Sequence, residues 1–199
     1  MREAEIVEAA FAVFARDGFA AAKVEAVAEL AKVSKGTVYV YFETKEALFE
    51  AVVRNYILAS IEEVAAGARD AGLNHEDRLR AVLSGAYRLF AGSDIRKIIV
   101  MLIGEGGRFP QLLDFYHDVV LVRAREILAR VVRDGVEAGA FRDAPVDKFP
   151  HLVMGPGMMG AIWTHHFNRL SPVDLDELYE AHVDLLLNGL RPRPSPSSR

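Results

Sequence analysis

The chain has 199 residues, of which 51% are hydrophobic and 26% are charged, and its formal net charge is −4. This length and composition allow a substantial buried core. The absence of cysteine excludes a disulfide framework and a thiolate nucleophile. The chain also lacks the roughly 18 consecutive apolar residues of a membrane span, and it does not open with a secretory signal. We therefore expect a cytoplasmic protein that does not use a membrane as a partner.

The first part of the chain predicts two short helices joined by a tight turn. Apolar residues recur at helical spacing from Val24 to Ala31, and this pattern stops near Lys32. Ser34 supplies a hydroxyl that can cap a second helix, and Thr44 can cap the helix after that. The sequence therefore indicates a helix-turn-helix followed by a long helix.

The helix that begins after Ser34 carries side chains suited to DNA. In helix-turn-helix proteins the N-terminal residues of the second helix meet base edges in the major groove. Here Lys35 can donate to a guanine edge and the Thr37 methyl can contact a thymine, with Gly36 leaving space between them. Tyrosine hydroxyls and the lysine after Thr44 are suited to phosphates. The predicted DNA contacts are Ser34, Lys35, Gly36, Thr37, Tyr39, Tyr41 and Lys45.

The same segment also has a simpler interpretation. A short helix that carries Val38, Tyr39, Tyr41 and Phe42 can be ordinary core, because helix-turn-helix shapes are a common packing motif. Residues 1–54 carry seven basic and nine acidic side chains, so this region is not a basic domain overall. From the residues alone, DNA binding and simple packing both stay open.

Helical periodicity continues along the chain, and no stretch alternates clearly as a strand would, so the predicted fold class is all-α. The predicted domains are a three-helix helix-turn-helix domain at residues 1–46 and a helical bundle for ligand binding and dimerisation at residues 47–190. A Pro- and Ser-rich tail, residues 191–199, is predicted to be disordered. The helix after Thr44 is expected to end near Ala68, and later helices are expected at residues 76–91, 94–104, 111–137, 146–168 and 174–190.

A Gly155-Pro156-Gly157 segment lies within the predicted helix 146–168. Proline removes one backbone hydrogen bond and the glycines leave room beside it, so we expect a kink that borders a cavity. Thioethers and aromatic rings suit an apolar ligand with one polar group. The candidate ligand-binding residues, each of which can also be ordinary core, are Tyr87, Phe90, Met101, Phe109, Phe115, Tyr116, Met154, Met158 and His165.

The last two predicted helices are unusually apolar for surface elements. Their apolar side chains are either internal core of one chain or the contact surface of a four-helix bundle between two chains. The candidate dimer-interface residues are Ile162, Trp163, Phe167, Leu178, Leu185 and Leu186.

We do not expect an enzyme, a cofactor or a metal site, and no catalytic residue is assigned. The adjacent His165 and His166 diverge by about 100° on a helix, and no ligand set such as HExxH accompanies them. The chain also has no nucleophile elbow, P-loop or dinucleotide-binding glycine pattern. A hydrolytic enzyme built from scattered Ser, His and Asp residues, and a helical ligand-binding protein without DNA binding, are the alternative functions.

The start of the chain resembles the DNA-binding half of the TetR (tetracycline repressor) family of transcriptional regulators. The shared pattern is an apolar first helix that ends at Gly18-Phe19, followed by Val33-Ser34-Lys35-Gly36-Thr37, then Tyr41-Phe42, then the helix start Lys45-Glu46-Ala47-Leu48. These ordered elements at the family spacing make the match specific, and they cover about the first quarter of the chain.

Four positions depart from the family pattern. Lys23 stands where a threonine often meets a phosphate, so we add Lys23 to the predicted DNA contacts, although a lysine cannot cap a helix as an acceptor. Lys32 stands where glycine is usual, and a positive φ there would cost roughly 1 kcal/mol. Val40 stands where an aromatic residue is usual and Tyr41 where histidine is common, so the operator sequence cannot be borrowed from a relative.

The resemblance implies a homodimer formed through the last two long helices. Such a dimer would bind double-stranded DNA at a palindromic operator, with half-sites about one helical turn, roughly 34 to 36 Å, apart. It also implies a small apolar or amphipathic effector that shifts the long helix after Thr44 and releases the DNA, which is the behaviour of a repressor.

Overall fold

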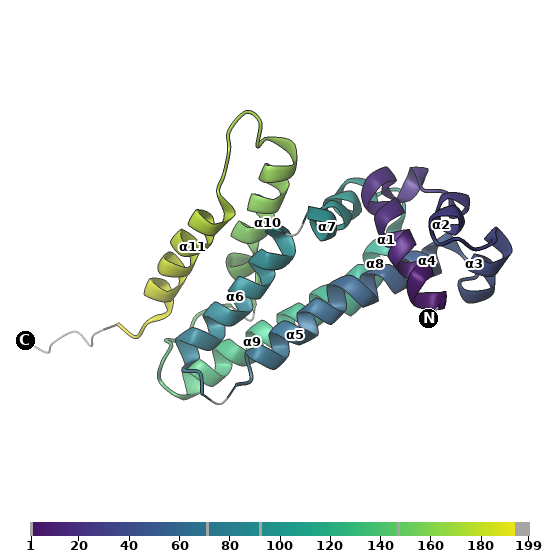
Figure 1. Ribbon diagram of the computed structural model, residues 1–199. Coiled ribbons are helices and arrows are strands. Elements are labelled where there is room, and N and C mark those ends of the chain that lie inside the picture. The colour runs from purple at the N-terminus through teal and green to yellow at the C-terminus, as the bar shows by residue number, and fades with distance from the viewer. Residues whose placement is uncertain (1, 71, 92, 147, 194–199) are drawn as a thin grey trace, which may run out of the picture. The chain divides into compact units, whose positions relative to one another are not determined.

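A computed structural model of the chain describes residues 2–70, 72–91, 93–146 and 148–193 (Figure 1). All regular elements within these ranges are helices, which confirms the predicted all-α fold class. The helices fall into two compact units. Unit 1 comprises Met1–Ser60 and Ala91–Val122, and unit 2 comprises Ile61–Phe90 and Arg123–Arg199.

Unit 1 contains the helix-turn-helix and two later helices. Its elements are α1 (Arg2–Ala21), α2 (Val24–Leu30), α3 (Lys35–Tyr41), α4 (Lys45–Val52), the π-helical segment η1 (Val53–Leu58), α7 (Ser93–Glu105), α8 (Pro110–Tyr116) and the π-helical segment η2 (His117–Leu121). Its core is aromatic: the Phe49 ring stands edge-on to the rings of Phe14 and Phe19, with ring centroids 5.3 and 5.5 Å apart. This cluster joins α1 to α4 and thereby supports α2, which packs beside α1, and α3, which packs against α2.

Unit 2 is built from the remaining helices, α5 (Ala59–Gly67), α6 (His75–Ala91), α9 (Val122–Glu137), α10 (His151–His166) and α11 (Leu175–Leu190). Helices α6, α9 and α11 share a core of fully buried side chains that includes Leu79, Leu83, Leu128, Val183 and Leu187. Helix α5 approaches α6 closely at Gly85, where a Cβ would lie 2.1 Å from Val64 Cγ2. Gly85 is therefore required by the packing of these two helices.

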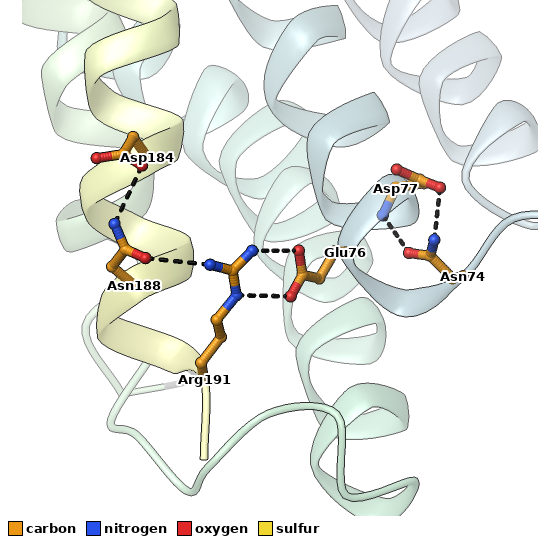
Figure 2. Close-up of polar contacts among 6 residues, drawn as sticks. All are labelled: Asn74, Glu76, Asp77, Asp184, Asn188 and Arg191. Carbon is orange, nitrogen blue, oxygen red and sulfur yellow. Dashed lines mark hydrogen bonds and ion pairs between the residues drawn. The ribbon is translucent and has the colours of Figure 1, made fainter. Parts of the chain in front are cut away.

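The C-terminal end of α11 is tied to the N-terminal end of α6 by polar contacts (Figure 2). The Arg191 guanidinium donates to both carboxylate oxygens of Glu76, each at 2.9 Å, and to the side-chain oxygen of Asn188 at 3.1 Å. Asn74 caps the first turn of α6, since its side-chain oxygen accepts from the backbone N–H of Asp77 at 2.9 Å. Arg191 opens the predicted disordered tail, yet it is held in this network. Residues 192 and 193 are exposed and form no regular element, and residues 194–199 of the predicted tail lie outside the described residues.

The predicted helices agree with the structure in most places and differ in two respects. The two long helices predicted after Thr44 and over residues 111–137 each contain a π-helical segment, η1 and η2, which the sequence did not indicate. The helix predicted from residue 146 begins instead at His151, and before it the Phe149 N–H donates to the Pro145 carbonyl at 2.8 Å. Helix α10 then runs through Pro156 as one element.

Candidate nucleic-acid interface

The turn between α2 and α3 has the backbone conformation that the family pattern suggested. Lys32 adopts φ 56°, a left-handed conformation that costs a non-glycine residue roughly 1–2 kcal/mol. The turn is closed by two backbone hydrogen bonds, from Lys32 N–H to the Glu29 carbonyl at 3.1 Å and from Val33 N–H to the Ala28 carbonyl at 2.9 Å. The helix-turn-helix therefore forms without the usual glycine.

Hydroxyl side chains cap the starts of α3 and α4, and both caps were predicted. Ser34 Oγ accepts from the Thr37 backbone N–H at 3.0 Å and begins α3, and Thr44 Oγ1 accepts from the Ala47 N–H at 3.0 Å and begins α4. The Ser34 and Thr37 hydroxyls also share a hydrogen bond of 2.8 Å. Both hydroxyls thus have a structural role in the first turn of α3.

One face of α3 is exposed and chemically varied. Val38 is buried and anchors α3 to the core, whereas Tyr39 and Tyr41 are exposed and Val40 is 82% exposed. Lys35 and Gly36 are exposed at the start of the helix. A Cβ at Gly36 would meet only Ser34 Oγ, at an ordinary contact distance of 3.7 Å, so the fold itself does not require glycine at this position.

Lys35 forms an ion pair that the sequence analysis did not identify. Its Nζ lies 2.6 Å from Oε1 of Glu25, in the first turn of α2, and 5.7 Å from the centre of the Tyr39 ring. The hydrogen bond with Lys35 lowers the pKa of the Glu25 carboxyl and raises the pKa of the Lys35 ammonium. Lys23, the other lysine near this carboxylate, is exposed and makes no side-chain cap at the start of α2.

Lys45 has a different environment from the other predicted DNA contacts. Its Nζ donates to the backbone carbonyls of Phe19, Ala20 and Ala22, at 2.8, 3.4 and 3.2 Å, and lies 4.5 Å from the centre of the Phe19 ring. Phe19 and Ala20 belong to the last turn of α1 and Ala22 follows it, where helix geometry leaves acceptors without partners. The geometry favours a structural role for Lys45, and its phosphate contact stays a prediction.

We expect Lys45→Met to lower the free energy of unfolding by about 1–3 kcal/mol, because three carbonyls lose their charged donor. Thermal or urea unfolding measures this change. DNA binding should weaken while the salt dependence of the binding constant keeps its wild-type slope. A phosphate contact would instead reduce that slope by about 0.9, so a reduced slope with unchanged stability would contradict the structural role.

The corner at Gly18, near the end of α1, is held by residues far away in the sequence. Gly18 turns the chain with φ 76°, and the next residues lie against the end of α7: Glu105 Oε2 accepts from the Ala20 N–H at 2.7 Å. Phe109 packs edge-on against Phe19, with ring centroids 4.9 Å apart. Glu105 was not among the predicted site residues. Phe109 supports the helix-turn-helix through this ring contact, and its ligand contact stays a prediction.

The remaining candidate ligand residues divide between the two units. In unit 1, Tyr116 is buried, Met101 is half-buried, and the Phe115 ring lies 5.0 Å from the Arg54 guanidinium. In unit 2 the candidates are Tyr87, Phe90, Met154, Met158 and His165. Tyr87 and Phe90 fill the space beside Gly157, where a Cβ would lie 3.0–3.2 Å from their rings.

Unit 2 also contains a buried polar contact between α6 and α11. The Tyr87 hydroxyl lies 3.1 Å from His182 Nδ1, and the Tyr179 ring stands edge-on to Tyr87 at 5.3 Å. His182 is 7% exposed, and its Nε2 has no hydrogen-bond partner among the described residues. Burial lowers the pKa of His182 from its ordinary value of 6.5. The sequence analysis missed this residue because a single histidine on a helix gives no signal.

The lowered pKa of His182 predicts a loss of stability in mild acid. Because the unfolded chain binds this proton more readily than the folded chain, the stabilisation is present above pH 6.5 and is lost as the pH falls through 6.5 to the folded pKa. We expect the melting temperature to fall with pH over this range and His182→Gln to flatten the fall. The same substitution at the exposed His151 controls for the loss of an imidazole, and equal profiles for His182→Gln and the wild type would contradict the assignment.

The candidate dimer residues differ in exposure. Trp163, Phe167 and Leu185 are exposed, the last at 74%. Ile162, Leu178 and Leu186 are half-buried. Leu178 packs within the chain against Gly160, where a Cβ would lie 2.7 Å from its side chain. Three further apolar residues in or just after α10 are also exposed: Leu152, Met159 and Leu170.

Neither a metal site nor a membrane-spanning helix is present in the described part of the chain. Within residues 2–70, 72–91, 93–146 and 148–193, no group of three His, Asp or Glu side chains is placed to hold a metal ion. Every helix in the same ranges is too short or too polar to span a lipid bilayer.

Comparison with known proteins identifies the family. A family model described as "Bacterial regulatory proteins, tetR family" matches residues 6–52, and one described as "Tetracyclin repressor-like, C-terminal domain" matches residues 68–182. The uncharacterised HTH-type transcriptional regulator YhgD of Bacillus subtilis is 30% identical over 148 residues, which cover 71% of this chain and 72% of YhgD. The HTH-type transcriptional repressor KstR2 of Rhodococcus jostii is 23% identical over 197 residues, which cover 95% of this chain and 91% of KstR2.

A solved structure shows the same fold along nearly the whole chain. The transcriptional regulator FadR from Bacillus subtilis, in complex with stearoyl-CoA, superposes with a TM-score of 0.75 at 19% identity, and the match covers 94% of this chain and 98% of that chain. Together with the family models, the geometry of α2 and α3 confirms the resemblance seen in the sequence. The chain belongs to the TetR family of bacterial regulatory proteins and is a transcriptional regulator.

Proposed function

We propose that the protein is a repressor that binds a palindromic DNA operator as a homodimer and leaves it when a small amphipathic ligand binds. The main support for DNA binding is the first turn of α3, where Lys35 and Gly36 are exposed to solvent. The packing of the free chain does not require glycine at position 36, which is consistent with a partner that approaches the backbone there. A helix start that is open and carries a donor suits close approach to base edges in the major groove.

The other proposed DNA contacts surround this turn. The exposed rings of Tyr39 and Tyr41 can present hydroxyls to phosphates on one side, and the exposed Lys23 can do so at the start of α2. Ser34 and Thr37 remain in the proposed contact set, with the Thr37 methyl available for a thymine because its hydroxyl is bonded to Ser34. Lys45 also stays in the proposed contact set. To reach a phosphate, its ammonium must leave the three backbone carbonyls to which it donates in the free chain.

The proposed dimer uses the exposed apolar side chains of α10 and α11. Met159 and Trp163 on α10 and Leu185 on α11 are large apolar residues that water contacts in the single chain. A second copy related by two-fold symmetry would bury them, and it would also place two copies of α3 for two half-sites of one operator. The proposed domains are those predicted from the sequence. They are a DNA-binding helix-turn-helix domain at residues 1–46 and a ligand-binding and dimerisation domain at residues 47–190.

The proposed effector is an amphipathic molecule with a long apolar part. Support comes from the apolar and aromatic candidates Tyr87, Phe90, Met154 and Met158 in unit 2. The stearoyl-CoA bound to the FadR structure has this chemical character, which makes it a suitable first probe. Release of DNA requires that the ligand bind the DNA-incompetent conformation more tightly than the DNA-bound one.

Selection of bound sequences from random duplex DNA tests the proposal directly. We expect a palindrome whose half-site centres are about one helical turn apart, and binding that weakens steeply with salt. Stearoyl-CoA added to the purified complex should then release the DNA. No enrichment of any sequence, even at low salt, would favour a helical ligand-binding protein, and an enriched site without two-fold symmetry would contradict the proposed dimer geometry.

A further inference from the structure

Glu25 and Lys35 place an acceptor and a donor side by side on the exposed face of the helix-turn-helix. The two side chains come from the first turns of α2 and α3, their charged ends are 2.6 Å apart, and they are 60% and 51% exposed. We propose that this ion pair reads one G·C base pair in each operator half-site, with Glu25 as a specificity-determining residue. This inference rests on the proposed function, because it assumes that α3 enters the major groove.

The hydrogen-bonding groups of the pair match the major-groove edge of G·C. Guanine presents two acceptors there, N7 and O6, and cytosine presents one donor, its N4 amino group, directly beside O6. A lysine ammonium carries three donors and no acceptor, whereas an ionised carboxylate carries only acceptors. Lys35 can therefore donate to guanine while Glu25 accepts from the neighbouring cytosine, and the contact between the two side chains need not be broken.

The same pair makes fewer hydrogen bonds on A·T. On that edge the adenine N6 amino group lies between two acceptors, adenine N7 and thymine O4, and the thymine methyl stands beyond O4. With Glu25 accepting from N6, the Lys35 ammonium can donate to N7 alone on one side, or to O4 alone on the other side beside the methyl group. On G·C the ammonium can donate to both N7 and O6, so the number of hydrogen bonds favours G·C.

The surroundings of Glu25 keep it ready for this role. The hydrogen bond with Lys35, then one from the Glu25 backbone N–H, and to a smaller extent the charge of Lys23, lower the pKa of the Glu25 carboxyl, so it stays an ionised acceptor. An ionised carboxylate has about four lone-pair sites, so it can accept from cytosine as well as from these donors. An acidic group near the phosphates weakens DNA binding in general, and a base contact gives this exposed carboxylate a function that offsets the repulsion.

The test compares Glu25→Ala with Glu29→Ala on the operator selected by the wild type. Glu29 is exposed on the same helix, and within residues 2–70 the structure gives it no ion pair, so its substitution removes an equal charge without the contact to Lys35. For every single base-pair change in the half-site, binding is measured by competition. We expect Glu25→Ala to reduce the preference for G·C by about fivefold or more at one symmetric position only. Glu29→Ala should leave every preference unchanged, and Lys35→Ala should act at the same base pair as Glu25→Ala.

A change in the DNA isolates the proposed hydrogen bond. At the G·C pair that responds to Glu25→Ala, the cytosine of the operator is replaced by pyrimidin-2-one, which lacks the N4 amino group; guanine stays opposite. The wild type should bind the modified operator about fivefold more weakly than the unmodified one. The Glu25→Ala variant should bind both operators equally, because the modified base and the substitution remove the same contact. Thermal melting of each variant verifies that the helix-turn-helix is still folded.

Three outcomes would overturn the inference, and they can be told apart. If Glu25→Ala strengthens binding to all sequences alike, Glu25 is only a counter-ion of Lys35. If the base pair that responds to Lys35→Ala is A·T, the assignment to G·C is wrong. If the wild type selects no sequence at all, the proposed DNA-binding function fails together with the inference.

Discussion

Leu185→Glu should convert the protein from a dimer into a monomer and weaken operator binding by at least about a hundredfold. The side chain of Leu185 is 74% exposed in the single chain, so the substitution should have little effect on the fold of unit 2. In the proposed dimer the same position is buried against a second copy, where an unpaired carboxylate is strongly unfavourable. A monomer binds one half-site without the gain from a second linked site, which is typically a factor of about 10²–10⁴.

Sedimentation velocity measures the oligomeric state, and a gel-shift titration measures the loss of affinity. Leu185→Met is the matched control: it keeps the volume and the apolar surface, so the dimer should persist. Trp163→Arg is a second variant on the facing helix, although it also removes the hydrogen bond from Trp163 Nε1 to the Ser171 carbonyl. Dimers of wild-type affinity in both Leu185→Glu and Trp163→Arg would place the interface elsewhere.

Helix starts and turns that depend on residues close together in the chain could be predicted from the sequence. Ser34 and Thr44 cap the helices that begin directly after them, because the cap bond reaches only three residues along the chain. Asp174 begins α11 in the same way. The left-handed backbone at Lys32 was suggested by the family pattern, since glycine usually occupies that position.

The contacts that define the site chemically could not be predicted, because they join residues that only the tertiary fold brings together. Lys45 reaches Phe19, 26 residues earlier, Glu105 holds Ala20 from 85 residues away, and Tyr87 meets His182 across 95 residues. Sequence periodicity places each of these side chains on a helix but does not say which helices meet. The partners of Lys35 and Lys45 decide which lysine is available to DNA.

One difference had a usable signal in the sequence. Pro145 and Pro150 both lie at the start of the predicted helix 146–168, and proline is favoured at the first positions of a helix and disfavoured inside it. That rule would have moved the start to about Pro150, one residue before His151, where α10 begins. The π-helical segments η1 and η2 had no such signal, since they share the apolar pattern of the helices that they interrupt.

Gly36→Ala should make the protein more stable and a weaker DNA binder. Glycine within a helix costs up to about 1 kcal/mol relative to alanine, and the added methyl would meet only Ser34 Oγ at 3.7 Å in the free chain. In the complex the same methyl would stand between the first turn of α3 and the DNA. Overpacking of a close contact costs about 1–3 kcal/mol, which corresponds to a loss of affinity of roughly fivefold to more than a hundredfold.

Gly104→Ala separates the two effects. Gly104 is exposed within α7, and a Cβ there would meet nothing within 4 Å, so this variant should gain comparable helix stability without a change at α3. Thermal melting should rise in both variants, whereas operator affinity should fall only in Gly36→Ala. If Gly36→Ala binds the operator as tightly as Gly104→Ala does, DNA does not approach the first turn of α3 closely, and the reading surface must lie on another part of the helix-turn-helix. A gain in stability together with a loss of operator affinity cannot be explained by the free chain alone. A substitution that raises the free energy of unfolding at an exposed position weakens binding only where the partner occupies the space of the added atoms.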